Sequence, residues 1–235
     1  MSGRHTRRGW GRWGLTRRET HTVWDGTEAC CAEGPGQGRD DPQYIRALVL
    51  AAAKALPVDK LKVGIFGWSN GGFLANRIAC EHSYLAKAVV NFAGSTFMDE
   101  GRCRPTEPVH YLGIHGTRDD SIPFLGGLIP GGDLVRTAIP GAEETARRWA
   151  ALNGCKGADQ PKTGVFLVET EYTFASASNV WLEVDAESWG RCAPGGSAAL
   201  WKIEAGTHHT HYKATDMTLR FLRFLLVHTA SSDAA

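Results

Sequence analysis

The sequence predicts an α/β domain built on a mostly parallel sheet with helices on both faces. Short apolar runs typical of strands alternate along the chain with stretches whose apolar residues recur at helical spacing. The length of 235 residues suits one hydrophobic core. The hydrophobic fraction of 43% and the charged fraction of 22% are those of an ordinary globular protein, which excludes wholesale disorder.

The first half of the chain shows a helix, a strand and a second helix in close succession. Asp41 and Pro42 supply an N-cap and a first-turn proline for a helix that we expect to end before Pro57. Residues 63–66 form a short apolar run of the kind found in strands buried on both faces. That run leads into the glycine-rich residues 67–72 and then into a helical pattern over residues 73–80.

Further strands and helices are expected downstream. The expected strands are residues 88–92, 111–114, 165–168, 180–184 and 200–204, and the expected helices are residues 142–152 and 216–228. Residues 121–140 hold three prolines and many glycines, which predicts a loop. The pattern is least regular in residues 164–200.

Charge and hydropathy exclude two classes of function. Lys and Arg total 26 against 25 Asp and Glu, a net charge of +1, whereas a dedicated nucleic-acid binder usually carries a strong basic excess. The longest apolar runs are too short to cross a bilayer, which takes about 20 residues. No obligate protein partner is evident from the sequence.

The N-terminal segment is basic and lacks the pattern of an export signal. Residues 1–20 contain six arginines and no apolar core, so they do not form a secretory signal peptide. We expect residues 1–23 to be a disordered tail ahead of a domain spanning residues 24–230. The alternative is a chain that starts late.

The six cysteines favour an oxidising compartment. An even count spread along the chain fits a few disulfides, whereas the absence of a CxxC pair disfavours structural zinc. Adjacent Cys30 and Cys31 would then need separate, distant partners. Six buried thiols are the alternative. The cysteines are Cys30, Cys31, Cys80, Cys103, Cys155 and Cys192.

A G-x-S-x-G motif lies between the expected strand at 63–66 and the following helix. Its residues are Gly67, Trp68, Ser69, Asn70 and Gly71. A nucleophile elbow requires this strand–turn–helix setting, in which the glycines make room for a strained turn that lifts the serine oxygen clear of the sheet. The alternative is a glycine-rich turn with an incidental serine.

An acid and a histidine follow the serine in the order that such a site requires. Asp119 and Asp120 come after the expected strand at 111–114, and His208, His209 and His211 come after the late strand. A carboxylate can orient a histidine that acts as base for the serine. Three histidines in four residues could instead hold a metal, although no further ligand motif has typical spacing.

These residues resemble the secreted polyhydroxybutyrate depolymerase and feruloyl esterase family of α/β-hydrolases. The resemblance covers residues 24–228 and is carried by Trp24, Cys30-Cys31, Asp40-Asp41, Val58-Asp59-Lys60, the residues 67–72 and Ala79-Cys80-Glu81. It implies an α/β-hydrolase fold and a serine ester hydrolase that needs no metal or cofactor. The implied substrate is an ester of a hydroxyacid polymer or of a cell-wall feruloyl group, and the implied location is extracellular.

The resemblance assigns roles to individual residues. An HGTxDxxVP segment matches residues 115–123 with Ile122 in place of Val, and it implies that Asp119 is the acid. The catalytic histidine carries over to His208, but Thr207 replaces a glycine and the usual Trp-Pro is absent, so His209 stays a rival. The resemblance also implies a Cys155–Cys192 disulfide.

One part of the family pattern is missing from this sequence. An α/β-hydrolase forms its oxyanion hole from the amide after the nucleophile, here Asn70, and from a second amide in an early loop. Nothing in residues 1–24 resembles the family's Leu-His-Gly segment. We therefore expect an N-terminally truncated fold with an exposed sheet edge and weak activity. A catalytically silent hydrolase-like module and a serine peptidase are the alternatives.

Overall fold

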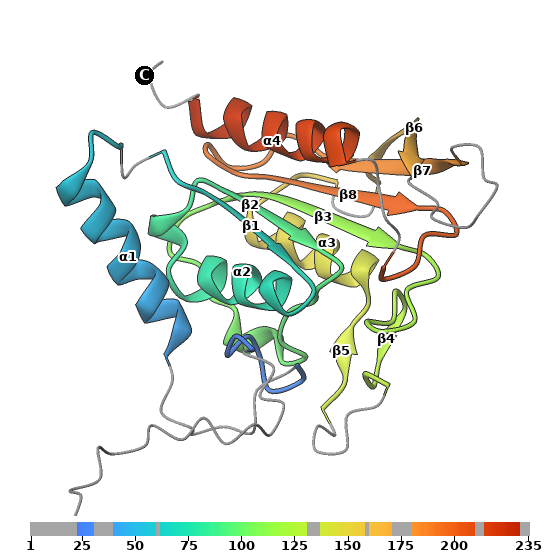
Figure 1. Ribbon diagram of the computed structural model, residues 1–235, viewed down its shortest axis with the longest axis horizontal. Coiled ribbons are helices and arrows are strands. Elements are labelled where there is room, and N and C mark those ends of the chain that lie inside the picture. The colour runs from blue at the N-terminus through green and yellow to red at the C-terminus, as the bar shows by residue number, and fades with distance from the viewer. Residues whose placement is uncertain are drawn as a thin grey trace, which may run out of the picture.

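A six-stranded sheet in the order β1-β2-β3-β8-β7-β6 forms the centre of the molecule (Figure 1). The structure, a computed structural model, describes residues 23–30, 40–59, 62–130, 137–157, 160–170, 180–209 and 214–230. The expectations for residues 1–22 and for Cys31 lie outside this part of the chain.

The elements of the sheet and its helices have the following bounds. The strands are β1 (Gly64–Trp68), β2 (Ala88–Phe92), β3 (His110–Gly116), β6 (Lys162–Thr170), β7 (Val180–Trp189) and β8 (Ser197–Ile203), with a separate two-stranded pair of β4 (Gly126–Gly127) and β5 (Ile139–Pro140). The α-helices are α1 (Asp41–Ala55), α2 (Asn70–Glu81), α3 (Ala142–Leu152) and α4 (Ala214–Ala230). Two 3₁₀ turns cover Ser83–Leu85 and Glu100–Arg102.

The sheet is mostly parallel, as the sequence predicts. β1, β2, β3 and β8 run parallel to one another. β7 pairs antiparallel with both β8 and β6, so the irregular region of the sequence forms a long hairpin at one edge of the sheet. Within the described residues, β1 has a strand on one side only.

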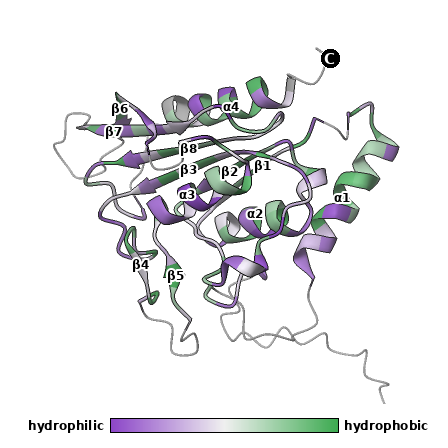
Figure 2. Ribbon diagram, turned by 180° about the vertical axis from the view of Figure 1, so that it is seen from behind, coloured by the Kyte–Doolittle hydropathy of each residue, from purple (hydrophilic) through white to green (hydrophobic). Residues whose placement is uncertain are grey.

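Helices cover both faces of the sheet, which confirms the expected layers. α2 and α3 lie on one face and α4 lies on the other (Figure 1). Alternate residues of β2 show this division: Val89 packs in a core with Trp149 of α3, whereas Val90 packs with Phe221 of α4. α4 itself carries both apolar and polar residues along its length (Figure 2).

Two local expectations need correction. The N-cap of α1 is Asp40, whose side chain accepts a hydrogen bond from the Gln43 amide at 3.0 Å. Asp41 does not cap the helix, because its carboxylate accepts from the Asp25 amide at 2.6 Å instead. Residues 121–140 are not wholly a loop, since β4 and β5 pair within them.

Two disulfides whose cysteines both lie in the described part of the chain connect loops to the core. Cys155–Cys192 confirms the pairing that the family resemblance implies, and it joins the end of α3 to the segment between β7 and β8. Cys80–Cys103 joins the last turn of α2 to the residue after the second 3₁₀ turn. Both therefore restrict segments that pack against the sheet.

None of the helices in the described part of the chain is both long enough and apolar enough to span a membrane.

Candidate active site

Ser69 occupies a strained turn between β1 and α2. Its φ of 54° is a left-handed value that non-glycine residues rarely adopt. Backbone hydrogen bonds hold the turn in place. The Ser69 amide donates to the Phe92 carbonyl at 2.8 Å, and the Ser69 carbonyl accepts from the Gly72 amide at 2.8 Å. Gly67 is required here, since a Cβ would lie 2.0 Å from the Gly71 carbonyl oxygen.

Ser69, His208 and Asp119 form a continuous hydrogen-bonded chain. Ser69 Oγ lies 2.9 Å from His208 Nε2, and His208 Nδ1 lies 2.8 Å from Asp119 Oδ2. A carboxylate only accepts hydrogen bonds, so His208 Nδ1 carries a hydrogen and donates a hydrogen bond to Asp119. Nε2 is then the acceptor for the Ser69 hydroxyl. His208 is 6% exposed and Asp119 8%, so the inner part of this chain is shielded from water.

The three side chains meet because they follow three parallel strands. Ser69 follows β1, Asp119 follows β3 and His208 follows β8, and the carboxyl ends of parallel strands lie at the same edge of a sheet. The strands β3 and β8 are direct neighbours.

Backbone hydrogen bonds also lock the acid loop to the histidine loop. The Thr117 amide donates to the Ile203 carbonyl at 3.0 Å, and the Arg118 amide donates to the Gly206 carbonyl at 2.9 Å. Gly116 permits this approach, because a Cβ there would lie 2.2 Å from the Gly206 carbonyl oxygen. Asp119 and His208 are thus fixed relative to each other by main chain as well as by their own contact.

Asp119 is held as a carboxylate. Burial alone would raise its pKa, but hydrogen bonds from His115, His208 and the Ile122 amide outweigh that effect and hold the pKa well below its ordinary value. The Ile122 amide donates to Oδ1 at 2.7 Å and the Ser121 amide at 2.9 Å. The oxygen facing His208 is Oδ2, so the two oxygens have separate tasks.

His115 is a buried neighbour of the acid that the motifs did not single out for a role. Its Nε2–H donates to the Ile122 carbonyl at 2.9 Å and lies 3.3 Å from Asp119 Oδ2. The ring also packs edge-on against Phe124, with centroids 5.7 Å apart. The only signal in the sequence was its place at the start of the matched segment 115–123.

The structure separates the paired candidates that the sequence left open. Asp120 is exposed and accepts from Ser121 Oγ at 3.3 Å, whereas Asp119 faces the histidine. His209 is exposed, and its ring lies edge-on against His208 with centroids 4.9 Å apart. Among the described residues, no three His, Cys, Asp or Glu side chains are grouped to hold a metal ion, and His211 lies outside that part of the chain.

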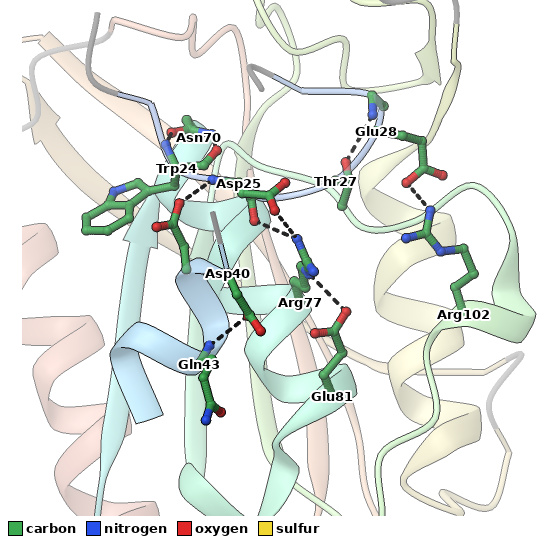
Figure 3. Close-up of polar contacts among 12 residues, drawn as sticks. Trp24, Asp25, Thr27, Glu28, Asp40, Gln43, Asn70, Arg77, Glu81 and Arg102 are labelled. Carbon is green, nitrogen blue, oxygen red and sulfur yellow. Dashed lines mark hydrogen bonds and ion pairs between the residues drawn. The ribbon is translucent and has the colours of Figure 1, made fainter. Parts of the chain in front are cut away.

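Asn70 begins α2, and its side chain holds residues 23–30 beside the turn (Figure 3). Asn70 Oδ1 accepts from the Trp24 amide at 2.6 Å, and Nδ2 donates to the Trp24 carbonyl at 2.9 Å. The Trp24 amide is therefore already bonded to a side chain. The backbone amide of Asn70 belongs to the first helical turn, where N–H groups have no partner within the helix and attract negative charge.

We name residues 23–30 the strap, because several charged contacts fasten this segment to α1, α2 and the loop after β2. Arg77 of α2 binds the Asp25 carbonyl at 3.0 Å and the Asp25 carboxylate at 2.9 Å, and it also pairs with Glu81 at 2.9 Å (Figure 3). Arg102 pairs with Glu28 (Figure 3). Ala29 and Cys30 are buried in a small core with Phe73.

Comparison with known proteins identifies esterases among the relatives. No family model matches the chain. "Feruloyl esterase B" of Piromyces equi is 29% identical over 140 residues, which cover 57% of this chain and 25% of that protein. "Probable feruloyl esterase C" of Aspergillus terreus is 26% identical over 151 residues, 63% of this chain and 50% of that protein. "Putative esterase NocK" of Nocardia uniformis subsp. tsuyamanensis is 29% identical over 158 residues, covering 67% of this chain and 40% of that protein. The chain thus spans a quarter to a half of the length of these curated relatives.

A solved structure shares the arrangement of the sheet and its helices. "Acetyl xylan esterase from Aspergillus awamori" superposes with a TM-score of 0.51 over 78% of this chain and 67% of that chain, at 14% sequence identity. The fold is that of the α/β-hydrolases. In an α/β-hydrolase, the turn after the nucleophile strand presents a serine, and the acid and histidine follow later in the chain. Ser69, Asp119 and His208 occur in that order in this chain.

Proposed function

We propose that this α/β-hydrolase is a serine carboxylic ester hydrolase. The single observation that carries the proposal is the hydrogen-bonded chain from Ser69 Oγ through the His208 ring to Asp119 Oδ2, with distances of 2.9 and 2.8 Å. A serine hydroxyl is a weak nucleophile until a base takes its proton, and this geometry supplies the base and the group that orients it.

The proposed reaction passes through an acyl-enzyme. Ser69 Oγ attacks the ester carbonyl carbon while His208 Nε2 takes the hydroxyl proton, and the Asn70 amide stabilises the oxyanion. The C–O bond to the alcohol then breaks, and His208 returns the proton to the leaving alcohol. Water attacks the acyl-enzyme with His208 again as base, which releases the acid and restores the Ser69 hydroxyl.

The feruloyl ester of a cell-wall polysaccharide is the substrate class that we favour. Two of the relatives carry the words "feruloyl esterase" in their names, which supports an aryl-acid ester over a hydroxyacid polyester. We further propose that the protein works outside the cell. The disulfides Cys80–Cys103 and Cys155–Cys192 support this proposal, because structural disulfides persist mainly in oxidising compartments.

Two assays with purified protein test the proposal. A fluorophosphonate probe should label Ser69 in the wild-type chain and leave Ser69→Ala unlabelled, because labelling requires an activated serine. Hydrolysis of methyl ferulate should exceed hydrolysis of polyhydroxybutyrate film and of peptide p-nitroanilides. A wild-type chain that neither labels nor hydrolyses p-nitrophenyl acetate would favour the silent module, and preference for the anilides would favour a peptidase.

A further inference from the structure

Trp68 places its indole ring against the face of the proposed base. The ring centroids of Trp68 and His208 are 5.3 Å apart with an interplanar angle of 27°, which is a stacked arrangement. Trp68 is the last residue of β1 and directly precedes the nucleophile. The same strand end therefore supplies both the serine and a surface for the histidine.

The two hydrogen bonds of His208 leave one motion of its ring unrestrained. The bonds from Nδ1 to Asp119 and from Ser69 to Nε2 lie roughly in the plane of the imidazole. Two in-plane bonds at opposite sides of a ring fix its position but allow it to tilt about the line that joins them. Contact on the face of the ring is needed to stop this tilt, and Trp68 makes such a contact.

A second ring closes the cluster. His209 lies edge-on to Trp68 with centroids 5.9 Å apart, and edge-on to His208 at 4.9 Å. Trp68 is 44% exposed, so a large part of the indole lies outside the core. The indole of Trp68 therefore packs against the rings of His208 and His209 and is not enclosed by the core.

We infer that Trp68 is a positioning residue for His208. The indole holds the imidazole plane in line with Ser69 Oγ, and its negative ring face stabilises the imidazolium that forms when His208 takes the serine proton. This inference rests on the proposed function, because it assigns a task only if His208 acts as the base.

The experiment compares three variants with the wild type. Trp68→Leu removes the aromatic face and Trp68→Phe keeps a face. Trp181→Leu removes another exposed tryptophan, on β7 (54% exposed), as the matched control. For each, we would measure kcat and KM for p-nitrophenyl acetate, the second-order rate of Ser69 labelling by a small fluorophosphonate, and the melting temperature.

The expected result is a loss in kcat and labelling rate without a change in KM. Trp68→Leu should lose about tenfold in both rates, the size that corresponds to one aromatic–cation contact. Trp68→Phe should recover to within about threefold of the wild type, and Trp181→Leu should match the wild type.

Two outcomes would overturn the inference. Unchanged labelling by Trp68→Leu together with a raised KM would make the indole a substrate wall instead. Equal losses in Trp68→Leu and Trp68→Phe, or a loss that follows a fall in melting temperature, would show a structural role. Failure of the wild type itself to label at Ser69 would refute the proposed function, which distinguishes the two failures.

Discussion

Ser69 combines a strained backbone with a side chain that has little room for change. A non-glycine residue in a sparsely populated backbone region costs on the order of 1–3 kcal/mol and persists when the surroundings fix it. Here the surroundings are the hydrogen bonds to Phe92 and Gly72. The strain lifts the hydroxyl toward His208, so the cost lies where the proposed chemistry needs it.

Replacing Ser69 should distinguish the effect of its hydroxyl on ester hydrolysis from the effect of its backbone conformation on stability. Ser69→Ala and Ser69→Gly should both abolish ester hydrolysis, because each lacks the nucleophile. Ser69→Ala should change the free energy of unfolding by less than about 1 kcal/mol. Ser69→Gly should be more stable than Ser69→Ala by about 1 kcal/mol, since glycine adopts φ of 54° without strain. Urea unfolding of both variants measures the difference, and equal stabilities would show that the turn is not strained.

The two adjacent acids should respond very differently to amide substitution. Asp119→Asn should lower kcat by about 10⁴-fold, as expected when the orienting carboxylate of a triad is lost, whereas Asp120→Asn should leave kcat within about twofold. Asp120 is the matched control because it is exposed and accepts a hydrogen bond from Ser121 Oγ. Similar losses in both variants would mean that Asp119 does not orient the base.

At the residue scale the sequence predicted candidate site residues but not the contacts between them. The G-x-S-x-G motif indicates Ser69, the order of acid and histidine leaves more than one candidate for each, and the family resemblance favours Asp119 and His208. The structure places Ser69, Asp119 and His208 within hydrogen-bond distance. The choice between His208 and His209 depends on which ring the loop turns inward, a matter of packing that adjacent identical residues do not reveal. The same holds for the face-to-face contact of Trp68 with His208 and for the role of His115.

Among the elements, the strap depends on side chains that belong to distant parts of the chain. Its contacts come from Asn70 and Arg77 of α2, Asp41 of α1 and Arg102 of the loop after β2. The sequence contains no pattern that would predict this, because ion pairs between a loop and a helix leave no periodicity. Most of the elements, by contrast, follow from periodicity, although the hairpin of β6 and β7 was poorly defined and the short strands β4 and β5 were expected to be part of a loop.

Removing the main anchor of the strap should release it without unfolding the domain. Arg77→Ala loses contacts to the Asp25 carbonyl, the Asp25 carboxylate and Glu81, so the amides of residues 23–30 should exchange with solvent at least tenfold faster. Arg147→Ala is the matched control, since Arg147 pairs with Glu144 on the surface of α3. Hydrogen exchange followed by mass spectrometry provides the measurement, and unchanged exchange in Arg77→Ala would contradict the assigned anchor.

The contact between the start of β3 and the end of α4 should make stability depend on pH. His110 stacks on His228 with centroids 4.1 Å apart, and burial, His228 and Lys87 lower its pKa to about 4. The pKa of His110 in the unfolded chain is about 6.5. Between about pH 4 and 6.5, therefore, the unfolded chain binds a proton at His110 that the folded chain does not bind. This contribution to stability is full above pH 6.5 and is lost as the pH falls toward 4.

The loss at His110 should be roughly 1–2 kcal/mol after discounting for solvent screening. Urea unfolding at pH 7.5 and pH 4.5 should show a larger drop for the wild type than for His110→Gln, which cannot be protonated in this range. The comparison between the two proteins removes the contribution of acidic residues that titrate in the same range. An equal drop in both proteins would contradict the assignment.

For the whole molecule, the disulfides should contribute a large share of stability. Their loops span 23 and 37 residues, and chain-entropy estimates give about 3–4 kcal/mol for closing loops of this size. Cys80→Ser with Cys103→Ser, and separately Cys155→Ala with Cys192→Ala, should each lower the free energy of unfolding by about 2–4 kcal/mol. Calorimetry of the oxidised and reduced wild type is the independent check, and equal melting temperatures would exclude this contribution.

The overall layers followed from the sequence, but the strand order did not. Alternating strands and helices predict a mostly parallel sheet covered on both faces, whereas nothing in the local pattern indicates that β8 lies between β3 and β7. Strand order depends on which distant apolar faces fit together, so it is a property of the assembled core. The triad geometry depends on that order, because β8 carries the loop with His208.

The central place of β8 means that the site is incomplete until the last strand of the chain has joined the sheet. Ser69 and His208 are 139 residues apart in the chain, and Asp119 and His208 are 89 apart. A chain still being synthesised therefore contains Ser69 and Asp119 before it contains the last strand and His208. If His208 is the base, as proposed, Ser69 lacks that base during this interval, so we expect an unfinished chain not to attack esters. A reagent specific for the activated serine should therefore label only molecules in which β8 has joined the sheet.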